Sequence, residues 1–371
     1  MTAQQSPAPE LAHLFAIATE FQSLAPWKTF SDTPMIAHVD PVTNLTVYCS
    51  ILGANEEVFG LAMYPGDAGL QSLLRMLVPV DNAPPDTEAG MLQTAWLLSF
   101  DVRRELMVED KALLKAAGVR MQKGVRRFPT FHSHEPAWLP QTCTAQECRQ
   151  ITDVLACVNR FVRDAHNDPS LITTLENFER KSGRTRFPIY VPAPADHGAP
   201  WVIRWIDATT ARDEPSFPPF EICATDVQRL RVQCPPTADC WQLGTFLLPT
   251  PVKERSGGRL FFPRVLLITD AARPFVFHSQ LHTPHDNVSH AIGSEFIAAL
   301  QTNQHRPTTL QVANKSHADI LRPLCAALDI QVKIAAELPS LEDAKNSLIN
   351  DAMMRDLQMQ AQDGLGSGMM Q

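Results

Sequence analysis

The sequence predicts an α+β protein of two domains: an N-terminal antiparallel meander with helices, and a C-terminal mixed sheet containing a β-α-β-α unit. The chain has 371 residues, enough for about two domains of ordinary size. Its first half alternates short strand-like runs with helical runs, and its last third repeats the order strand, helix, strand, helix. Residues 166–200 lose this periodicity and collect prolines, which predicts a linker between the domains.

The composition is that of a globular protein. Hydrophobic residues make up 44% and charged residues 19% of the chain, which excludes a mostly disordered protein, a collagen-like repeat and a long coiled coil. The net charge of -8 argues against a whole surface that binds nucleic acid or anionic lipid. No apolar run approaches the roughly 18 residues of a membrane helix, so no membrane partner is expected. The 8 cysteines form no C-x-x-C pair and follow no secretory leader, which favours reduced thiols and a cytoplasmic location.

The N-terminal module is predicted over residues 9–165. Apolar residues at helical spacing predict a helix over 9–24. Gly66-Asp67 offers a cap for a second helix, which carries Leu70, Leu73, Leu74 and Leu77. The strands are predicted at 35–39, 45–52, 58–64, 96–102 and 128–134. Thr144 and Glu147 form a capping box, in which each side chain bonds the other residue's backbone N–H, and they begin the last helix of the module.

The C-terminal module is predicted over residues 201–354, followed by a disordered tail over 355–371. Strands or strand-and-turn regions are predicted at 201–206, 227–234, 245–248, 265–269, 275–281, 309–313 and 331–334, and helices at 288–300, 317–328 and 341–353. The last two strands should be parallel because a helix connects them. Two or three antiparallel strands followed by helix, strand, helix, strand and helix are compatible with a degenerate RNase H-like layout.

Two groups of residues resemble an uncharacterised bacterial family that joins two modules. The first group is Val47–Gly53, Val58–Leu61 and Tyr64–Leu70, and the second is Arg306–Leu310, Leu328–Ile330 and Leu338–Leu341. The resemblance would cover most of residues 10–350, and it implies no biochemical function. Some relatives end in a Cys/His zinc-binding motif, whereas this chain ends in Gly-Leu-Gly-Ser-Gly-Met-Met-Gln, so no such zinc site carries over.

One alternative is a metal-dependent nuclease or phosphodiesterase, in which carboxylates hold two divalent ions. An RNase H-like layout requires one acid in the first strand and another at the end of the first parallel strand. Asp270 loosely satisfies the first place, whereas Asn314 occupies the second, and a neutral amide cannot supply the required charge. Glu295 and Asp319 could complete the set, although a solvated helical turn and a helix cap are simpler roles for them. No catalytic residue is assigned; Asp270, Glu295 and Asp319 are the candidates if the protein is an enzyme.

A second alternative is a histidine-ligated metal protein. His278, His282, His285 and His290 lie within thirteen residues, and imidazole nitrogen suits Zn²⁺, Ni²⁺ or Cu²⁺. Because Pro284 interrupts the segment, no regular spacing makes these side chains converge, and solvated loop histidines are the competing interpretation. The metal candidates are His278, His282 and His285, and no other cofactor is expected.

A basic run precedes an aromatic strand in the N-terminal module. It consists of Arg120, Lys123, Arg126 and Arg127. This composition suits contact with nucleic acid or with an acidic protein, and a solvated turn is the competing interpretation. The sequence contains no G-x-S-x-G, no phosphate-binding glycine loop and no G-x-G-x-x-G. It therefore favours a non-enzymatic binding or adaptor protein with a protein partner, and nucleic acid is the alternative partner.

Overall fold

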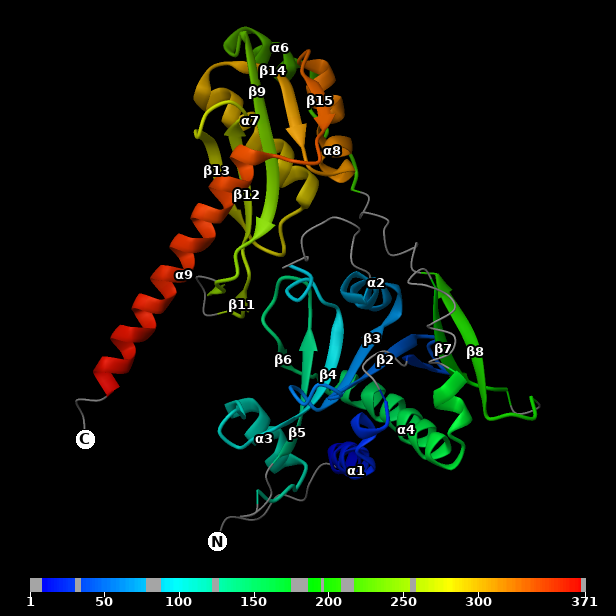
Figure 1. The fold of residues 1–371 in the computed structure, drawn as a ribbon. Coiled ribbons are helices and arrows are strands. Elements are labelled where there is room, and N and C mark those ends of the chain that lie inside the picture. Colours follow the sequence, from blue (N-terminus) through cyan, green and yellow to red (C-terminus); the bar gives the residue numbers. More distant parts are fainter. Residues whose placement is uncertain are drawn as a thin grey trace. The chain divides into compact units, whose positions relative to one another are not determined.

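The computed structural model divides the chain into two compact units (Figure 1). The first unit comprises residues 1–136 and 140–213, and the second comprises residues 137–139 and 214–371. The structure describes residues 9–30, 35–77, 88–121, 127–174, 186–194, 197–207, 217–253 and 258–367. Strands and helices occur in both units, which confirms the predicted α+β class.

An eight-stranded sheet forms the centre of the first unit, in the order β6-β5-β4-β3-β2-β1-β7-β8. The strands are β1 (Met35–Val39), β2 (Thr46–Leu52), β3 (Gly60–Pro65), β4 (Ala95–Asp101), β5 (Phe128–His134), β6 (Gln141–Thr142), β7 (Arg186–Pro192) and β8 (Trp201–Asp207). Neighbours from β1 to β6 are antiparallel, which confirms the predicted meander. β7 pairs with β1 in parallel, and β8 pairs with β7 antiparallel.

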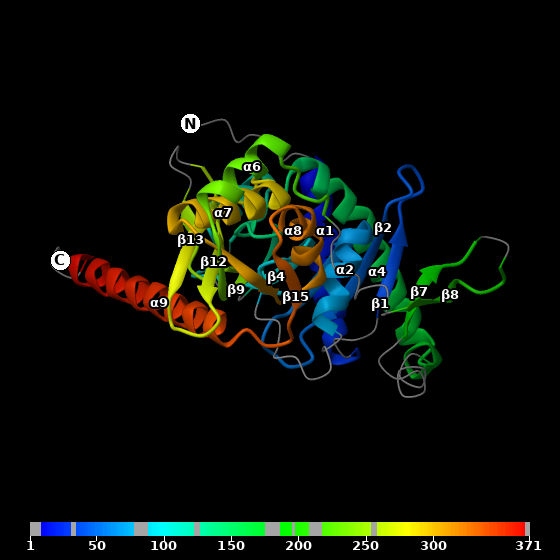
Figure 2. The same cartoon turned by 90° about the horizontal axis from the view of Figure 1, so that it is seen from above.

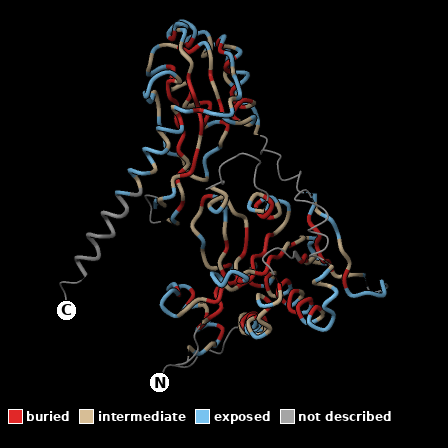
Figure 3. Tube along the Cα trace, in the orientation of Figure 1, coloured by how far each residue is buried: buried red, intermediate tan, exposed pale blue. Residues whose placement is uncertain are grey.

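Helices cover both faces of this sheet. α1 (Pro9–Leu24) and α4 (Ala145–Asn167) pack on one face, α2 (Gly66–Leu77) packs on the other, and α3 (Val108–Ala116) follows β4 in the chain. The alternation of β2 explains the two layers, because Cys49 and Ile51 face α1 and α4 whereas Tyr48 faces α2. Figure 3 shows the buried residues concentrated along the strands.

The predicted capping box of α4 is confirmed. Glu147 N donates to Thr144 Oγ1 at 3.3 Å, and Thr144 N donates to Glu147 Oε2 at 2.6 Å. The Glu147 carboxylate also accepts from Trp96 Nε1 at 3.0 Å and from Ser133 Oγ at 2.6 Å. Burial alone would raise the pKa of Glu147, but the donors from Ser133 and Thr144 outweigh it and lower the pKa. One carboxylate therefore both caps α4 and fixes it to β4 and β5.

A five-stranded sheet forms the centre of the second unit, in the order β13-β12-β9-β14-β15. The strands are β9 (Pro236–Leu247), β12 (Arg264–Asp270), β13 (Val276–His282), β14 (Arg306–Val312) and β15 (Gln331–Ile334), and β10 (Val252–Lys253) pairs with β11 (Leu260–Phe261). β9, β12 and β13 are antiparallel, whereas β14 and β15 run parallel to β9. Three antiparallel strands are thus followed by helix, strand, helix, strand and helix, as the sequence predicts, and β9 is the first strand of this layout.

Helices also cover both faces of the second sheet. α6 (Ala224–Gln233), α7 (Val288–Asn303) and α8 (Lys315–Ala327) pack on one face, and the beginning of α9 (Pro339–Ser367) packs on the other. Figure 2 shows α7 and α9 on opposite sides of β9 and β12. We call these faces the α7 face and the α9 face. Among the described residues, no helix has the length and apolar character needed to cross a membrane.

The division between the units lies after residue 213, and not within the predicted linker of residues 166–200. The prolines of this segment led to the prediction of a linker where the structure has strand β7. Phe187, Ile189 and Val191 alternate along β7 and are buried on the face of the first sheet that α2 covers. Strand 201–206, predicted to begin the second domain, is β8 of the first sheet. β7 and β8 join the first sheet because β7 pairs with β1, which is far away in the sequence. A local sequence pattern cannot predict such a pairing.

Three further predictions in the second half are wrong. The segment 227–234 is mostly helix α6, because Val227, Leu230 and Cys234 have helical spacing toward one core. Asn314 caps α8, through a 2.8 Å bond from His317 N to its Oδ1, so Asp319 has no capping role. The backbone of α9 is helical to Ser367 and includes much of the predicted disordered tail, which is rich in strong helix formers.

Candidate functional site

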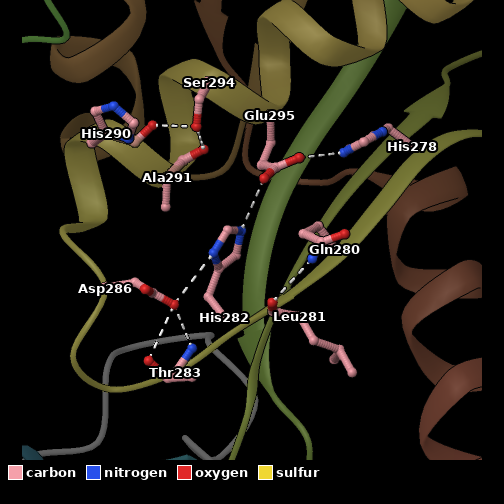
Figure 4. A network of polar contacts seen from close by, with 10 residues as sticks. All are labelled: His278, Gln280, Leu281, His282, Thr283, Asp286, His290, Ala291, Ser294 and Glu295. Carbon is pink, nitrogen blue, oxygen red and sulfur yellow. Dashed lines mark hydrogen bonds and ion pairs between the residues drawn. The ribbon is translucent and has the colours of Figure 1, made fainter.

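The second unit places a glutamate between two histidines where β13 lies against α7 (Figure 4). His278 and His282 are four residues apart on β13, so both point to the α7 face, where Glu295 projects from α7. His278 Nε2 lies 2.6 Å from Glu295 Oε2, and His282 Nε2 lies 3.8 Å from Glu295 Oε1. The expectation of a solvated role for Glu295 is therefore wrong, because its carboxylate joins strand to helix.

A second carboxylate extends this network at the turn between β13 and α7. Asp286 Oδ2 lies 3.6 Å from His282 Nδ1 and accepts bonds from Thr283 N at 2.7 Å and from Thr283 Oγ1 at 3.2 Å. The side chain of Asp286 is 45% exposed, whereas that of Glu295 is 20% exposed. We call His278, His282, Asp286 and Glu295 the β13 network. With neutral imidazoles, the network presents two negative charges beside the strand.

The three predicted metal histidines do not come together. His278 and His282 share Glu295, but the ring of His285 packs beside Trp138, with 5.0 Å between the ring centroids. Across the part of the chain that the structure describes, no group of three or more His, Cys, Asp or Glu side chains has an arrangement that could hold a metal ion. The turn at Pro284 separates His285 from the face that the other two histidines share.

The three candidate nuclease acids have separate partners. Asp270 lies at the end of β12, the second strand of the layout, where its Oδ1 accepts from Ala272 N at 2.8 Å and its Oδ2 lies 3.4 Å from Arg273 Nε. Glu295 belongs to the β13 network. Asp319 is on α8, and the hydrogen bond from Lys315 lowers its pKa. The assignment of Asp270 to the first strand is therefore wrong, because β9 occupies that place.

Two glutamines occupy the region where the layout would need its acids. Gln242 is in the middle of β9 and Gln311 lies beside it on β14, and Gln242 Nε2 donates to Gln311 Oε1 at 3.0 Å. Gln242 Oε1 accepts from Leu341 N, at the start of α9, at 3.1 Å. Neutral amides cannot hold two Mg²⁺ ions, so this pair links β9, β14 and α9 structurally. No local pattern in the sequence reports this pair, because the two glutamines are 69 residues apart in the chain.

The predicted basic run is only partly described. Arg120 is exposed, whereas Arg127 donates from Nη1 to Phe100 O at 2.9 Å and lies 5.0 Å above the ring of Phe59. Lys123 and Arg126 lie outside the described residues. Arg127 thus has a structural role in the first unit, and the structure does not show a basic surface formed by the four residues.

Among the strands that the structure describes, β13 is an edge of its sheet, with β12 as its single neighbour. A β-bulge beside Thr269 separates Val276 from the regular pairing of residues 278–282. On the α9 face, Leu281 is 54% exposed, and Val276 is also exposed. The sequence predicted the strand, but it could not predict which strands would be edges, since strand order depends on long-range pairing.

A pocket of about 310 Å³ lies elsewhere in the second unit, at α6 and α7. It is lined by Phe220, Glu221, Ile222, Cys223, Asp226, Arg229, Leu230, Ile297 and Gln301. Arg229 pairs with Asp226 at 2.9 Å, and Asp226 also accepts from the thiol of Cys223 at 2.8 Å. None of the described site residues predicted from the sequence lines this pocket.

Comparison with known protein families finds one match in each half of the chain. Residues 12–181 match a domain of unknown function, DUF7309, and residues 226–349 match another domain of unknown function, DUF6930. The chain therefore joins two domains of unknown function in this order, which confirms the resemblance to an uncharacterised two-module family. The comparison with curated proteins found no match.

Proposed function

We propose that the chain is a non-enzymatic adaptor that binds a partner protein by adding an extended segment of that partner to β13. An edge strand offers backbone N–H and C=O groups on the side where it has no neighbouring strand, and an extended peptide can pair with these groups. Main-chain pairing then supplies affinity, while the side chains on the two faces of the strand supply specificity.

The composition of β13 is the observation that carries this proposal. Of the other edge strands that the structure describes, β6, β10 and β11 have two residues each, β8 contains Arg204 and Asp207, and β15 contains Lys333. Charges and short length discourage pairing with other chains. β13 has seven residues without Lys, Arg, Asp, Glu or Pro, and it exposes Val276 and Leu281.

The side-chain contacts around β13 support the same function. The 2.6 Å contact between His278 and Glu295 holds the strand against α7, which reduces the conformational entropy lost when a partner binds. The amide pair of Gln242 and Gln311 supports a binding role over metal-dependent hydrolysis. All eight cysteines are free, which is in keeping with action in the reducing cytoplasm.

Selection of peptides from a library tests this function. Random nine-residue peptides displayed on phage would be selected on the full chain and then measured as purified peptides against two variants, Leu281→Lys and Ile334→Lys. Both parent side chains are 54% exposed, but Leu281 is on β13 and Ile334 is on the opposite edge, β15. We expect the Leu281→Lys variant to lose the selected peptides and the Ile334→Lys variant to keep them.

Hydrogen exchange provides a second measurement of the same binding. Selected peptides should slow exchange of the β13 amides in the wild-type chain and leave those of β15 unchanged. Peptides that bind both variants equally well, or a selection that yields no peptide, would overturn the proposed function.

A further inference from the structure

We propose that the segment bound by β13 alternates apolar residues with lysine or arginine. This inference rests on the proposed function, and it adds the chemical class of the partner segment. Its basis is the difference between the two faces that β13 would present to a new neighbouring strand.

The pairing with β12 assigns the residues of β13 to these faces. His278 and Gln280 stand opposite Ile268 and Leu266, whose side chains belong to the core on the α7 face. Leu281 stands opposite Val265, which belongs to the core on the α9 face. Side chains of an added strand would alternate in the same way, so every second residue would lie on the α7 face and the residues between them on the α9 face.

The α9 face favours an apolar partner residue. Leu281 and Val276 are exposed there, and the core beside them contains Val265 and Leu267. Leu348, on the same side of α9 as the packed Leu341, is also partly exposed. An apolar side chain opposite Leu281 would remove apolar surface from water on both strands.

The α7 face favours a basic partner residue. Glu295 and Asp286 contribute two carboxylates to the β13 network, and Arg264, opposite His282 on β12, contributes one guanidinium. With neutral imidazoles, the balance of these groups is negative. Side chains directly opposite each other on paired strands are about 5 Å apart at Cβ, so a lysine or arginine opposite His278 or Gln280 can reach the two carboxylates.

Three synthetic peptides test the inference. Each has nine residues with valine at every second position, and the remaining positions are lysine in the first peptide, glutamine in the second and glutamate in the third. Binding of each fluorophore-labelled peptide to the full chain would be followed by fluorescence anisotropy at low salt and at 0.5 M salt. We expect the lysine peptide to bind about three- to tenfold more tightly than the glutamine peptide at low salt, and the glutamate peptide to bind most weakly. The differences should shrink at high salt because ions screen exposed charges.

A matched pair of variants locates the source of this preference. Asp286→Asn removes a charge of the β13 network while leaving an oxygen that can accept the bond from Thr283 N. Asp319→Asn removes a carboxylate of similar exposure, 39% against 45%, from α8. The preference for the lysine peptide over the glutamine peptide should fall in the Asp286→Asn variant and persist in the Asp319→Asn variant, with melting temperatures used to confirm that both fold.

The outcomes separate this inference from the proposed function. Equal binding of all three peptides, abolished by Leu281→Lys, would retain strand addition and overturn the basic chemistry. A lysine preference that Asp286→Asn leaves intact would place the charge recognition elsewhere and also overturn the inference. Failure of every peptide to bind β13 would overturn both proposals.

Discussion

Nε2 of Gln242 lies 3.0 Å from Oε1 of Gln311, and this hydrogen bond joins the first strand of the second sheet to its parallel neighbour. Gln242 is 3% exposed, and its own oxygen accepts the backbone N–H of Leu341. Both ends of one amide are therefore satisfied inside the protein, a requirement that a carboxylate at the same position cannot meet.

Gln242→Glu should destabilise the second unit. Ionised glutamate cannot donate to Gln311, and it places a charge in a buried position, so we expect a loss of about 2 kcal/mol in the free energy of unfolding at pH 7. The loss should shrink at low pH, where a protonated glutamate again carries a donor. Urea unfolding measures the effect, and Gln280→Glu, at an exposed position of β13, is the control. Equal losses in the two variants would contradict the structural role of the amide pair.

Asp110 should contribute pH-dependent stability to the first unit. Burial alone would raise its pKa, but bonds from His132 Nε2, at 3.0 Å, and from Met107 N, at 2.9 Å, outweigh burial and lower the pKa below the usual 3.8. A carboxyl group whose pKa is lowered by folding stabilises the protein above its unfolded pKa, and this contribution disappears as the pH falls through the folded pKa. The difference in unfolding free energy between wild type and Asp110→Asn should thus be greatest above pH 5 and vanish in strong acid. Urea titrations at pH 7, 5 and 3 measure it, and a difference that grows with acidity would contradict the assignment.

Gly293→Ala should disrupt the packing of α7. A Cβ atom at this position would lie 2.1 Å from ring carbons of Phe220, much closer than van der Waals contact. We expect a loss of about 2 kcal/mol in unfolding free energy despite the better helix propensity of alanine. Gly90→Ala is the control, because a Cβ there meets nothing within 4 Å. Phe220→Leu should recover part of the loss in the double variant; full additivity of the two substitutions would mean that the two residues do not interact.

Cys223 should be the first thiol to react in the native protein. Its side chain is exposed, whereas burial raises the pKa of Cys148 and Cys157 to about 11 and that of Cys325 to about 12. Because the thiolate is the nucleophile, a disulfide reagent at pH 8 should modify about one thiol per chain rapidly and the others slowly. Absorbance of the released thiolate measures this, and Cys223→Ser should remove the fast phase. A fast phase that persists in the variant would show that another cysteine opens to solvent.

Local signals in the sequence predicted much of the fold correctly. The capping box of Thr144 and Glu147 placed the start of α4, because the bonds that stabilise it join residues three positions apart. The alternation of β2 and the helical spacing of α7 were readable for the same reason. β7 was missed because its position depends on pairing Ile189 with Met35, which no local pattern reports.

The candidate site shows the same limit. The sequence predicted a strand that ended at residue 281 and no regular spacing for the histidines, so it predicted neither the common face of His278 and His282 nor Glu295 as their shared partner. That contact depends on how α7 lies across the sheet. Likewise, the strand order was needed to identify β9 as the first strand, and so to show that Gln242, a neutral amide, occupies the position where a nuclease would need an acid. The sequence shows which residues could bind or react, but only the order and pairing of the strands and helices shows which of their side chains lie together.

The second unit takes residues 137–139 from the middle of the sequence of the first. Within that unit, Leu139 N donates to Leu260 O at 3.0 Å, Phe262 N donates to Ala137 O at 2.7 Å, and the ring of Trp138 packs beside Phe261. A fragment that begins at Glu214 therefore lacks the backbone partners of Leu260 and Phe262, and a fragment that ends at Asp213 leaves Trp138 without Phe261. The two units are interleaved along the gene, so neither can be lost, duplicated or exchanged by a single cut without leaving the other incomplete.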